Sequence, residues 1–430
     1  MGLPILVPVI GSQIIFGAFA KLKKKPYVLP AKCDYKPTIC VVIPAKNEGL
    51  RIQYALASLE MQTYPVEKVY VIDDGSEDNT IEVVRKMNIL MKDTEIELYG
   101  HKRSHGKTPG VKFATRTATT DKIMVLDADT ILSDPHYIEK IVRAHSDPKT
   151  GCSYGAVTPF SRKEQLKTLF EMLLTKHYPV SRELIMQYKN KVKMRPVDKI
   201  KYYLLRWPVE RYREALYLTD QYFSKDSALR VYGTTLFPIG CGVLYDRKLL
   251  KSQFDIYEST LGDNLTTSED IFIGFSLVNE GYKNVQIADA KMISAEPRVD
   301  RLPRQLFLWT SSFFQSAYYF RNMTFALKRK NNRPAVGWVI LPPIFEKITY
   351  PLALAYLVWF DYWYALLTLM IEFIAYMAIL RMSDPKMSKM HFFKICVVAL
   401  PLRVVNLFLD IYVTFRFVID LIIGRRNWRK

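Results

Sequence analysis

The sequence predicts an α/β protein in which a mostly parallel sheet is covered by helices on both faces, with membrane-type helices at both ends of the chain. Short β-branched runs alternate with segments of helical spacing between residues 39 and 127, the pattern of parallel strands joined by crossover helices. From about residue 336 onward the chain becomes strongly apolar, and an uncharged apolar run also opens it. These three observations together predict a polar domain that is attached to a membrane.

The predicted elements follow one another in a regular order. Residues 39–46, "ICVVIPAK", read as a buried strand, and "EGLRIQYALASLEMQ" has helical spacing. The pattern then repeats as strand 68–72, helix 80–88, strand 95–99, a helix in "GKTPGVKFATRTA" and strand 122–127. Ligands of such sheets bind beyond the carboxyl ends of the strands. Polar residues follow these ends and are expected to converge on one crevice: Asn47, Asp73, Asp74 and Asp127.

Residues 162–232 differ from this pattern. They are rich in Lys, Arg, Tyr and Leu and contain few turn signals, so they are predicted to form a helical insert. The stretch "EQLKTLFEMLLTKHY" (164–178) carries apolar residues at amphipathic spacing.

The composition limits the partners. The chain has 430 residues and a formal net charge of +19, which fits an anionic membrane face, phosphorylated ligands or nucleic acid. No known nucleic-acid module is present, so nucleic acid is not expected as a partner and stays a weak alternative. The five cysteines are scattered without a CxxC pair, which gives no indication of zinc and favours a reducing compartment.

The first 20 residues are predicted to form a transmembrane anchor. Four lysines follow the apolar run rather than precede it, unlike in a cleaved signal peptide. The positive-inside rule then places the following domain in the cytoplasm. A peripheral hydrophobic helix remains the alternative for this segment.

The C-terminal region, 334–430, contains two apolar runs near spanning length, 335–360 and 362–380. A third run, 391–423, is too short for two spans, and either an interfacial or re-entrant helix or a tilted single span would fit it. Residues 301–333 are expected to form an amphipathic segment at the membrane interface.

Two aspartates leave the fourth predicted strand side by side. Asp127 and Asp129 are separated only by Ala128. Carboxylates this close repel each other unless a cation or proton compensates their charge, and a hard divalent ion that also binds phosphate oxygens would do so. A solvated turn after a strand is the plain structural alternative.

Several further motifs occur in order along residues 38–320. They are "VVIPAKNE" (41–48), "YVIDDGSEDNT" (70–80), "HGKTPGVKFAT" (105–115), "LDADT", "IGCGVLYDRKLL" (239–250), "TSEDIFIGFSLVNEGYK" (267–283), "AEP" and "RQLFLW" (304–309). Together they resemble the family 2 glycosyltransferases, which have the Rossmann-like GT-A fold. The similarity looks closest to hyaluronan, chitin and cellulose synthase-like members.

The resemblance implies a role for each matching residue. Asp129 would ligate Mn²⁺ or Mg²⁺, and Asp127 would contact the ribose or the metal's water ligands. Asp270 would be the catalytic base, with Glu269 beside it, although both residues also suit a helix N-terminus. The remaining matches would bind the donor nucleotide sugar: Pro44, Asn47, Glu48, Asp73, Asp74, Lys107, Gln305 and Trp309.

One motif departs from the family pattern. The family's segment ends in Gln-x-x-Arg-Trp, and this chain keeps Gln305 and Trp309 but has Leu308 in place of the arginine. Candidates to replace it are nearby: Arg298, Arg301 and Arg304. Trp309 is either a stacking platform for an acceptor sugar or an aromatic residue at the membrane interface.

The expected function is therefore that of an integral membrane, metal-dependent and inverting glycosyltransferase. It would move a sugar from a UDP-sugar to a growing polysaccharide with a β-linkage, using a cytoplasmic catalytic domain at residues 36–300. Transfer of a single sugar to a lipid acceptor, such as polyprenyl phosphate or ceramide, is the first alternative. A non-catalytic membrane scaffold with the same fold is an alternative of another class.

Overall fold

The computed structural model describes residues 12–30, 35–91, 94–159, 196–261, 268–296, 299–327 and 334–424. The amphipathic stretch 164–178 and the first half of the predicted N-terminal anchor lie outside these residues.

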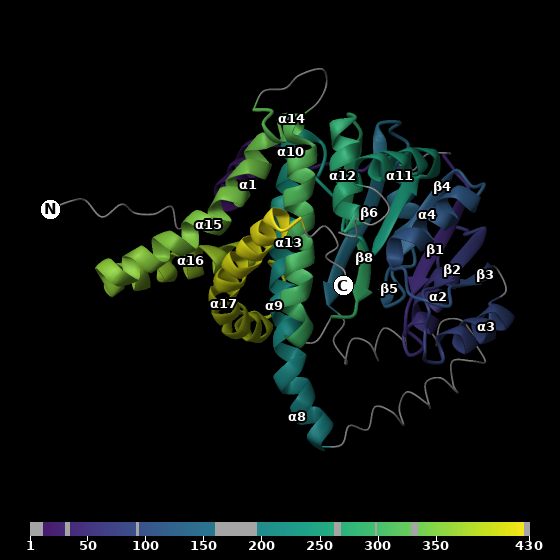
Figure 1. Ribbon diagram of the computed structural model, residues 1–430, viewed down its shortest axis with the longest axis horizontal. Coiled ribbons are helices and arrows are strands. Elements are labelled where there is room, and N and C mark those ends of the chain that lie inside the picture. Colours follow the sequence, from purple (N-terminus) through teal and green to yellow (C-terminus); the bar gives the residue numbers. More distant parts are fainter. Residues whose placement is uncertain are drawn as a thin grey trace.

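The described strands form a single mixed sheet in the order β3-β2-β1-β4-β7-β6-β8-β5 (Figure 1). Its first half, β3 to β4, is entirely parallel. In its second half, β7 runs antiparallel to both neighbours, and β5 is antiparallel to β8. The strands are β1 (Ile39–Ala45), β2 (Lys68–Asp73), β3 (Glu95–Gly100), β4 (Lys122–Leu126), β5 (Thr130–Leu132), β6 (Thr150–Pro159), β7 (Gly242–Asp246) and β8 (Lys283–Ser294).

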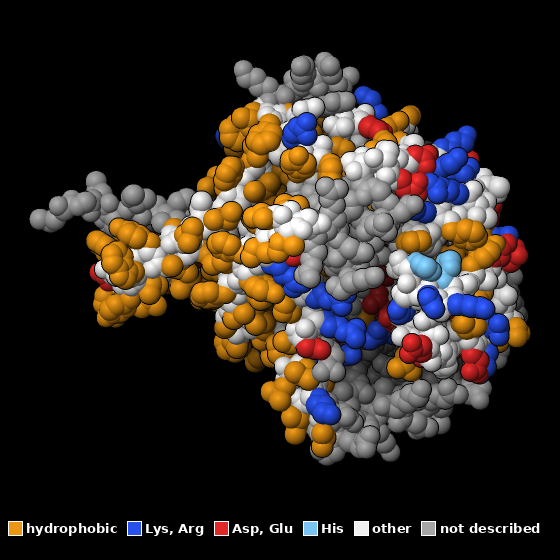
Figure 2. Space-filling view, in the orientation of Figure 1, with side chains coloured by type: hydrophobic (Ala, Val, Ile, Leu, Met, Phe, Trp, Pro, Cys, Tyr) orange, Lys and Arg blue, Asp and Glu red, His pale blue; other side chains and the backbone are white. Residues whose placement is uncertain are grey.

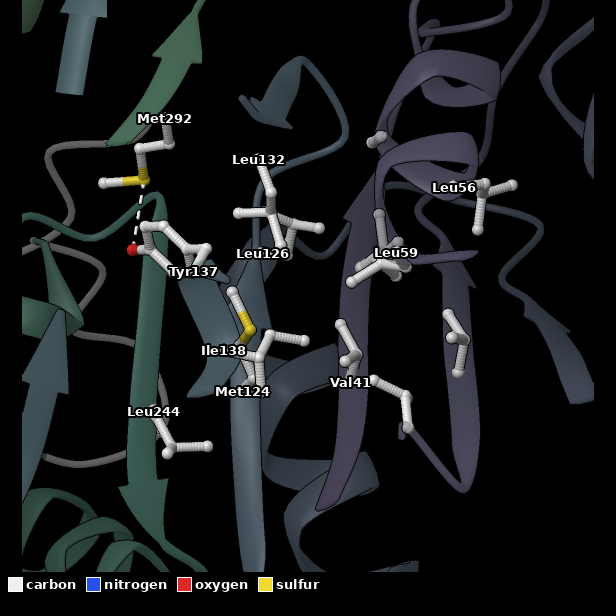
Figure 3. Close-up of a cluster of buried hydrophobic side chains, with 14 of the residues drawn as sticks. Val41, Leu56, Leu59, Met124, Leu126, Leu132, Tyr137, Ile138, Leu244 and Met292 are labelled. Carbon is white, nitrogen blue, oxygen red and sulfur yellow. Dashed lines mark hydrogen bonds between the residues drawn. The ribbon is translucent and has the colours of Figure 1, made fainter. Parts of the chain in front are cut away.

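Helices cover both faces of this sheet, as predicted. The side chains of β1 alternate between two cores: Val41 packs with α2 (Ile52–Glu60), α3 (Thr80–Leu90) and α5 (Tyr137–Ala144), as Figure 3 shows in part. Val42 faces the opposite core with α4 (Lys107–Thr117), α11 (Arg247–Leu261) and α12 (Glu269–Asn279). This period of two follows from the pleat of a strand that is buried on both sides.

The parallel half of the sheet brings the strand ends to one edge. Ala45, the last residue of β1, is paired with Asp73, the last residue of β2. β4 runs parallel to β1 on its other side and ends one residue before Asp127. The turns that carry the acidic motifs therefore share one edge, where the topology predicts ligand binding.

The described part of the predicted insert is helical. It forms α8 (Pro196–Leu205), α9 (Trp207–Thr219), the π-helix η1 (Asp220–Lys225) and α10 (Asp226–Tyr232). α9 packs against β6 on one side and against α17 (Lys389–Ile422) on the other. It thus lies between the sheet and the C-terminal helices (Figure 1).

The C-terminal region consists of long helices. The short η2 (Val299–Arg301) precedes α13 (Leu302–Tyr319), α14 (Arg321–Thr324), α15 (Gly337–Phe360) and α16 (Tyr362–Ser383). Among the described helices, α16 and α17 are long and apolar enough to cross a membrane. α17 is one continuous helix of 34 residues that contains the run 391–423 except for its last residue, and apolar side chains cover the outer surface of this region (Figure 2).

The described part of the N-terminal segment forms α1 (Ser12–Lys23), which packs against α10 and α15. Lys21 pairs with Asp226 at 2.7 Å, and the Ser12 backbone N–H donates to Glu346 at 2.6 Å. This end of the predicted anchor therefore docks onto the other helices.

Candidate active site

The turns after β1 and β2 are fastened to each other at the sheet edge. Asn47 adopts a left-handed backbone conformation with a φ of 56°, which asparagine tolerates better than most residues. Its backbone N–H donates to the Ser76 hydroxyl, and its side-chain oxygen accepts from the Glu77 N–H. Pro44, which is half-buried, pairs in register with Ile72 beneath these turns.

The adjacent acids Asp73 and Asp74 have different environments. Asp74 accepts hydrogen bonds from the Ser104 hydroxyl and the backbone N–H groups of His105 and Gly106, so its carboxylate holds the start of α4. Asp73 accepts from the Ser76 N–H through one oxygen, while its other oxygen is buried with no partner in the described part of the chain. Buried polar atoms are normally satisfied, so Asp73 is the one of the two acids that has an acceptor available for a ligand.

Lys107 lies between the acidic motif that follows β4 and the acidic motif that begins α12. Its ammonium donates to Asp127 Oδ1 at 2.7 Å and to the Gly240 carbonyl at 2.9 Å, and it lies 3.7 Å from Glu269 Oε1. Burial lowers the pKa of Lys107, but the negative charges of Asp127, Glu269 and Asp270 outweigh it and raise the pKa above its ordinary value. The lysine therefore stays charged at the centre of this cluster.

Glu269 and Asp270 begin α12 beside this lysine. Burial and the neighbouring Glu269 carboxylate raise the pKa of Asp270 to about 7. Glu269 is buried and accepts a hydrogen bond from the Thr108 hydroxyl. Both acids line a narrow cavity with Lys107, and its free volume of about 10 Å³ is close to what one water molecule needs.

Gly240 is required for the position of Asp270. A Cβ atom at residue 240 would stand 2.5 Å from Asp270 Oδ2, closer than van der Waals contact allows. The small-residue segment before β7 thus lets the carboxylate approach the sheet edge. Sequence reasoning had matched this segment to the family without assigning it this contact.

Asp129 lies in the turn between β4 and β5, within a cluster of negative charge. Burial and the nearby carboxylates of Asp127 and Glu48 raise the pKa of Asp129 to about 7. Burial also raises the pKa of Glu48, although Arg51 at 3.0 Å opposes this effect. Within the described residues, no group of three or more His, Cys, Asp and Glu side chains is arranged to hold a metal ion alone.

Similarity to known proteins identifies the family of this chain. The model of the family described as "Glycosyl transferase family 2" matches residues 40–254, which is half of the chain. The chain belongs to glycosyl transferase family 2. The match covers the sheet edge from β1 through Lys107, Asp127 and Asp129 to β7, whereas Glu269, Asp270 and the segment around Trp309 lie beyond it.

Similar proteins within the family include synthases and small-molecule transferases. The chain is 29% identical over 140 residues to the poly-beta-1,6-N-acetyl-D-glucosamine synthase of Staphylococcus epidermidis, across 31% of this chain and 33% of that protein. It is 30% identical over 152 residues to the validoxylamine A glucosyltransferase of Streptomyces hygroscopicus, across 33% of this chain and 35% of that protein. The alignments therefore span about a third of the length of each relative.

A solved structure confirms the GT-A-like fold over nearly the whole chain. The mannosyltransferase PcManGT from Pyrobaculum calidifontis, solved in complex with GDP-Man and Mn²⁺, superposes with a TM-score of 0.53 at 18% identity. The superposition covers 91% of this chain and 95% of that protein. The predicted fold class is thus confirmed, with the qualification that only the first half of the sheet is uniformly parallel.

The family's Gln-x-x-Arg-Trp segment lies on α13, and an arginine that sequence reasoning missed contacts it. Arg213, on α9, donates a hydrogen bond to Gln305 Oε1 and stacks on the Trp309 ring. Two of the residues considered as replacements for the missing motif arginine, Arg301 and Arg304, are exposed, and Arg298 lies outside the described residues. Arg213 precedes Gln305 by 92 positions and belongs to no motif, so only the three-dimensional structure could reveal it.

Proposed function

We propose that this chain is a membrane-associated, inverting glycosyltransferase that moves a sugar from a UDP-sugar to a growing polysaccharide. The observation that carries the proposal is the position of Lys107, whose ammonium lies 2.7 Å from Asp127 Oδ1 and 3.7 Å from Glu269 Oε1. The donor-binding turn and the acidic start of α12, where Glu269 precedes the candidate base Asp270, are thereby brought to one cation. A transfer site needs this proximity because both reactants must meet at a single carbon atom.

The carboxylates of Asp127 and Asp129 fit a divalent cation. They belong to a half-buried acidic cluster in which burial and neighbouring carboxylates raise the pKa of Asp129. A bound metal ion would offset this accumulation of negative charge. Two carboxylates with further oxygens from a diphosphate are a usual ligand set for Mg²⁺. A bound Mn²⁺ or Mg²⁺ would supply charge stabilisation for the departing diphosphate.

Lys107 supplies a second positive charge to the same leaving group. Its ammonium is held by Asp127 and the Gly240 carbonyl, so it needs no reorganisation to face a phosphate near the strand ends. Preorganised charges of this kind account for a large share of catalysis where negative charge develops.

Asp270 is the proposed general base. The acceptor hydroxyl would attack the anomeric carbon, forming a new carbon–oxygen bond as the bond to the UDP oxygen breaks. The hydroxyl proton would pass to Asp270, and the bonding electron pair would leave with UDP. A single displacement inverts the anomeric centre, so a UDP-α-sugar gives a β-linkage. A pKa of about 7 suits a base that works near neutral pH.

The nucleoside would lie over the turns after β1 and β2. Asp73 offers a buried carboxylate oxygen that has no partner in the described residues, which suits a uracil N–H or a ribose hydroxyl. Pro44, Asn47 and Glu48 would form the surrounding wall. Asp74 would act indirectly, because its oxygens already hold the start of α4.

The polysaccharide acceptor is proposed from the synthase relative. The relatives differ in the acceptors that their names give, since another is named a 4,4'-diaponeurosporenoate glycosyltransferase. Transfer of one sugar to a lipid acceptor is therefore the second candidate. Leu308, where synthase-like members have arginine, favours this alternative.

We further propose that residues 36–300 form a catalytic domain on the cytoplasmic side of a membrane. Residues 1–20 would anchor it, 301–333 would lie at the membrane surface, and 334–430 would form transmembrane and interfacial helices. The lysines after the first apolar run support this orientation. The apolar outer surface of α16 and α17 supports insertion into lipid.

The test is a screen of purified full-length protein against UDP-sugars with Mn²⁺ or Mg²⁺. UDP release is measured first, and mass analysis then separates polymer from glycolipid. Polymer with a β-linkage supports the proposal, and a glycolipid product favours the second candidate. If no UDP-sugar is hydrolysed or transferred, the proposed donor is wrong, and the scaffold alternative applies if GDP-sugars also fail.

A further inference from the structure

α17 carries an apolar stripe along its whole length. The helix has 34 residues, which gives a length of about 51 Å at about 1.5 Å per residue. Met390 and Ile422 mark the two ends of the stripe. An exposed apolar surface of this extent indicates a contact with a partner or a membrane. The side chains between these ends recur at helical spacing, and each is at least half exposed: Val397, Val405, Phe408, Tyr412, Phe415 and Ile419.

The opposite side of α17 is polar near its centre. Arg403 pairs with Glu372 on α16, and Asp410 pairs with Lys347 on α15. The stripe and these charged side chains therefore occupy opposite sides of the same helical turns. A helix that is apolar on one side and polar on the other along its length is typical of a membrane interface.

The first half of α17 rests on α9. Ile395 and Ala399 pack in one cluster with Ala215 of α9, and the His391 ring lies 2.6 Å from a Glu214 carboxylate oxygen. α9 packs in turn against β6 of the sheet. This half of the helix is thus held at the face of the sheet domain.

The second half of α17 rests on α13. The Phe417 ring lies 5.6 Å from the Phe314 ring, and the Arg416 guanidinium lies 4.6 Å from the centre of the Phe307 ring. α13 packs in turn against α12, which contacts the sheet. Ile395 and Phe417 are about 33 Å apart along the helix axis, close to the thickness of the hydrocarbon core of a bilayer. Because both halves contact helices that pack on the same domain, α17 runs along that domain.

α16 has a different orientation. Its last turns pack on α9 through Tyr376 and Leu380, whereas Tyr362 and Trp363 at its start are more than half exposed. The hairpin of α15 and α16 leads away from the sheet, and α17 stays beside α9 and α13 (Figure 1). α16 has 22 residues, and its length of about 33 Å is enough to cross the hydrocarbon core. One end of α16 therefore contacts the domain, whereas both ends of α17 do.

We propose that α17 lies in the plane of the membrane, with its apolar stripe in the leaflet that faces the catalytic domain. The hairpin of α15 and α16 crosses the bilayer, and α17 does not. The positive-inside rule favours the same side for the end of α17, because four basic residues follow it among 425–430. This inference rests on the proposed membrane association and defines its geometry. The exposed charged side chains of α17 are all basic and suit lipid phosphates: Lys389, Lys394 and Arg416.

Nitroxide depth measurements along α17 test this geometry. The full-length protein carries one reporter at a time, Val397→Cys, Phe408→Cys or Ile419→Cys, in vesicles of phosphatidylcholine and phosphatidylglycerol. The four native cysteines within the described residues are buried, and Cys33→Ser removes the fifth. The three labels are expected at one depth, about 5–10 Å into the boundary between headgroups and acyl chains. In a spanning α17 the label at residue 408 would instead lie about 15 Å deep, with the other two near opposite surfaces.

Met370→Cys on α16 is the matched comparison. Met370 is 52% exposed and lies near the middle of α16, so its label is expected at the centre of the bilayer. Val405→Cys and Tyr412→Cys, on the same stripe of α17, replace any reporter that lowers the melting temperature. A label at Met370 as shallow as those on α17 would overturn the crossing of the hairpin.

Chemical labelling tests on which side α17 ends. Lys86→Cys, on the exposed face of α3, reports sealed vesicles in which the catalytic domain faces outward. In these vesicles Lys430→Cys is expected to react with a membrane-impermeant maleimide to the same extent as Lys86→Cys. Reaction of Lys430→Cys only after detergent is added would overturn the inference.

These measurements do not depend on sugar transfer. Uniform shallow depths on α17 in a protein that releases no UDP from any UDP-sugar would overturn the proposed function and keep the membrane geometry. A label at residue 408 as deep as the label at Met370, in a protein with normal UDP release, would overturn this inference alone. A deep label at residue 408 without UDP release would overturn both.

Discussion

The Lys107 ammonium lies 2.7 Å from Asp127 Oδ1 and bridges it to the Gly240 carbonyl at 2.9 Å. Lys107 starts α4, Asp127 follows β4, and Gly240 precedes β7. Three separate segments thus meet at one cation. The resemblance assigned Lys107 to the binding of the donor nucleotide sugar, and the structure places its ammonium in contact with Asp127, one of the two predicted metal ligands.

Removing the ammonium group of Lys107 should slow catalysis. Lys107→Met is expected to lower kcat by about 100-fold, the usual effect of losing one preorganised charge at a departing anion. The measurement is UDP release at saturating donor. Lys86→Met, on the exposed face of α3, is the control and should keep full activity. Retention of more than half of the wild-type kcat by Lys107→Met would refute the role of Lys107.

A methyl group at residue 240 should displace the base. In Gly240→Ala the new Cβ would approach Asp270 Oδ2 to 2.5 Å, so the carboxylate or the turn must move. The variant is expected to be less stable by about 1–3 kcal/mol and to lose most of its activity. Gly100→Ala is the matched control, because no atom lies within 4 Å of its Cβ position. Thermal unfolding and UDP release in parallel check both effects.

The rate should depend on pH through Asp270. The base acts when it is deprotonated, and its pKa is about 7, so kcat is expected to rise with pH through neutrality and level off above it. Asp270→Asn should abolish both the activity and this rise. A rate that is flat between pH 5 and 9, measured as UDP release, would contradict the assignment.

The free energy of unfolding should fall as pH rises toward neutrality, whereas the rate should rise. The folded pKa of Asp270 lies above the value of about 3.9 in an unfolded chain, so the native state binds the extra proton between these values. Its contribution to the free energy of unfolding is therefore lost as pH rises from about 4 to about 7. Relative to wild type, Asp270→Asn is expected to gain more melting temperature at pH 8 than at pH 4. An equal gain at both pH values would contradict the burial of a charged base.

A buried carboxylate paired with a half-buried arginine also joins the C-terminal helices. Glu372 on α16 is 2% exposed and pairs with Arg403 on α17, and it also accepts from Tyr350 on α15. Glu372→Gln is expected to destabilise the chain by about 3–5 kcal/mol because it leaves the arginine unpaired. Adding Arg403→Met should recover most of this loss. Thermal unfolding in detergent measures both, and an unchanged melting temperature in the single variant would contradict a structural role.

Much of the fold could be predicted because local patterns determine it. The β-branched run around Val41 and Val42 is buried on both faces, and its length and bounding turns marked it as a strand. The reversal at β7 could not be predicted, because strand direction depends on long-range pairing with Met124 and its neighbours. Burial on both faces alone does not distinguish a parallel strand from an antiparallel one.

The candidate site also contains residues that the sequence predicted and residues that only the structure revealed. Residues at strand ends, such as Asp73 and Asp127, were found because the topology brings strand ends together. Arg213 was missed because it lies in no matched motif, and Glu296 lies in the matched "AEP" but was assigned no role. The contacts of Arg213 with Glu296 and Gln305 span 83 and 92 residues of chain. The distinction between Asp73 and Asp74 also needed the structure, since only their hydrogen bonds separate an acid with an unpaired carboxylate oxygen in the described residues from one that holds the start of α4.

The most direct test of the central claim, that Asp127 and Asp129 hold a divalent cation at the departing UDP, is the metal dependence of Asp129→Asn. Wild-type protein freed of metal is expected to release no UDP until Mn²⁺ or Mg²⁺ is added back. Asp129→Asn is expected to stay inactive at metal concentrations that fully restore the wild type. Normal turnover by Asp129→Asn in metal-free buffer would contradict the claim and the assignments that depend on it.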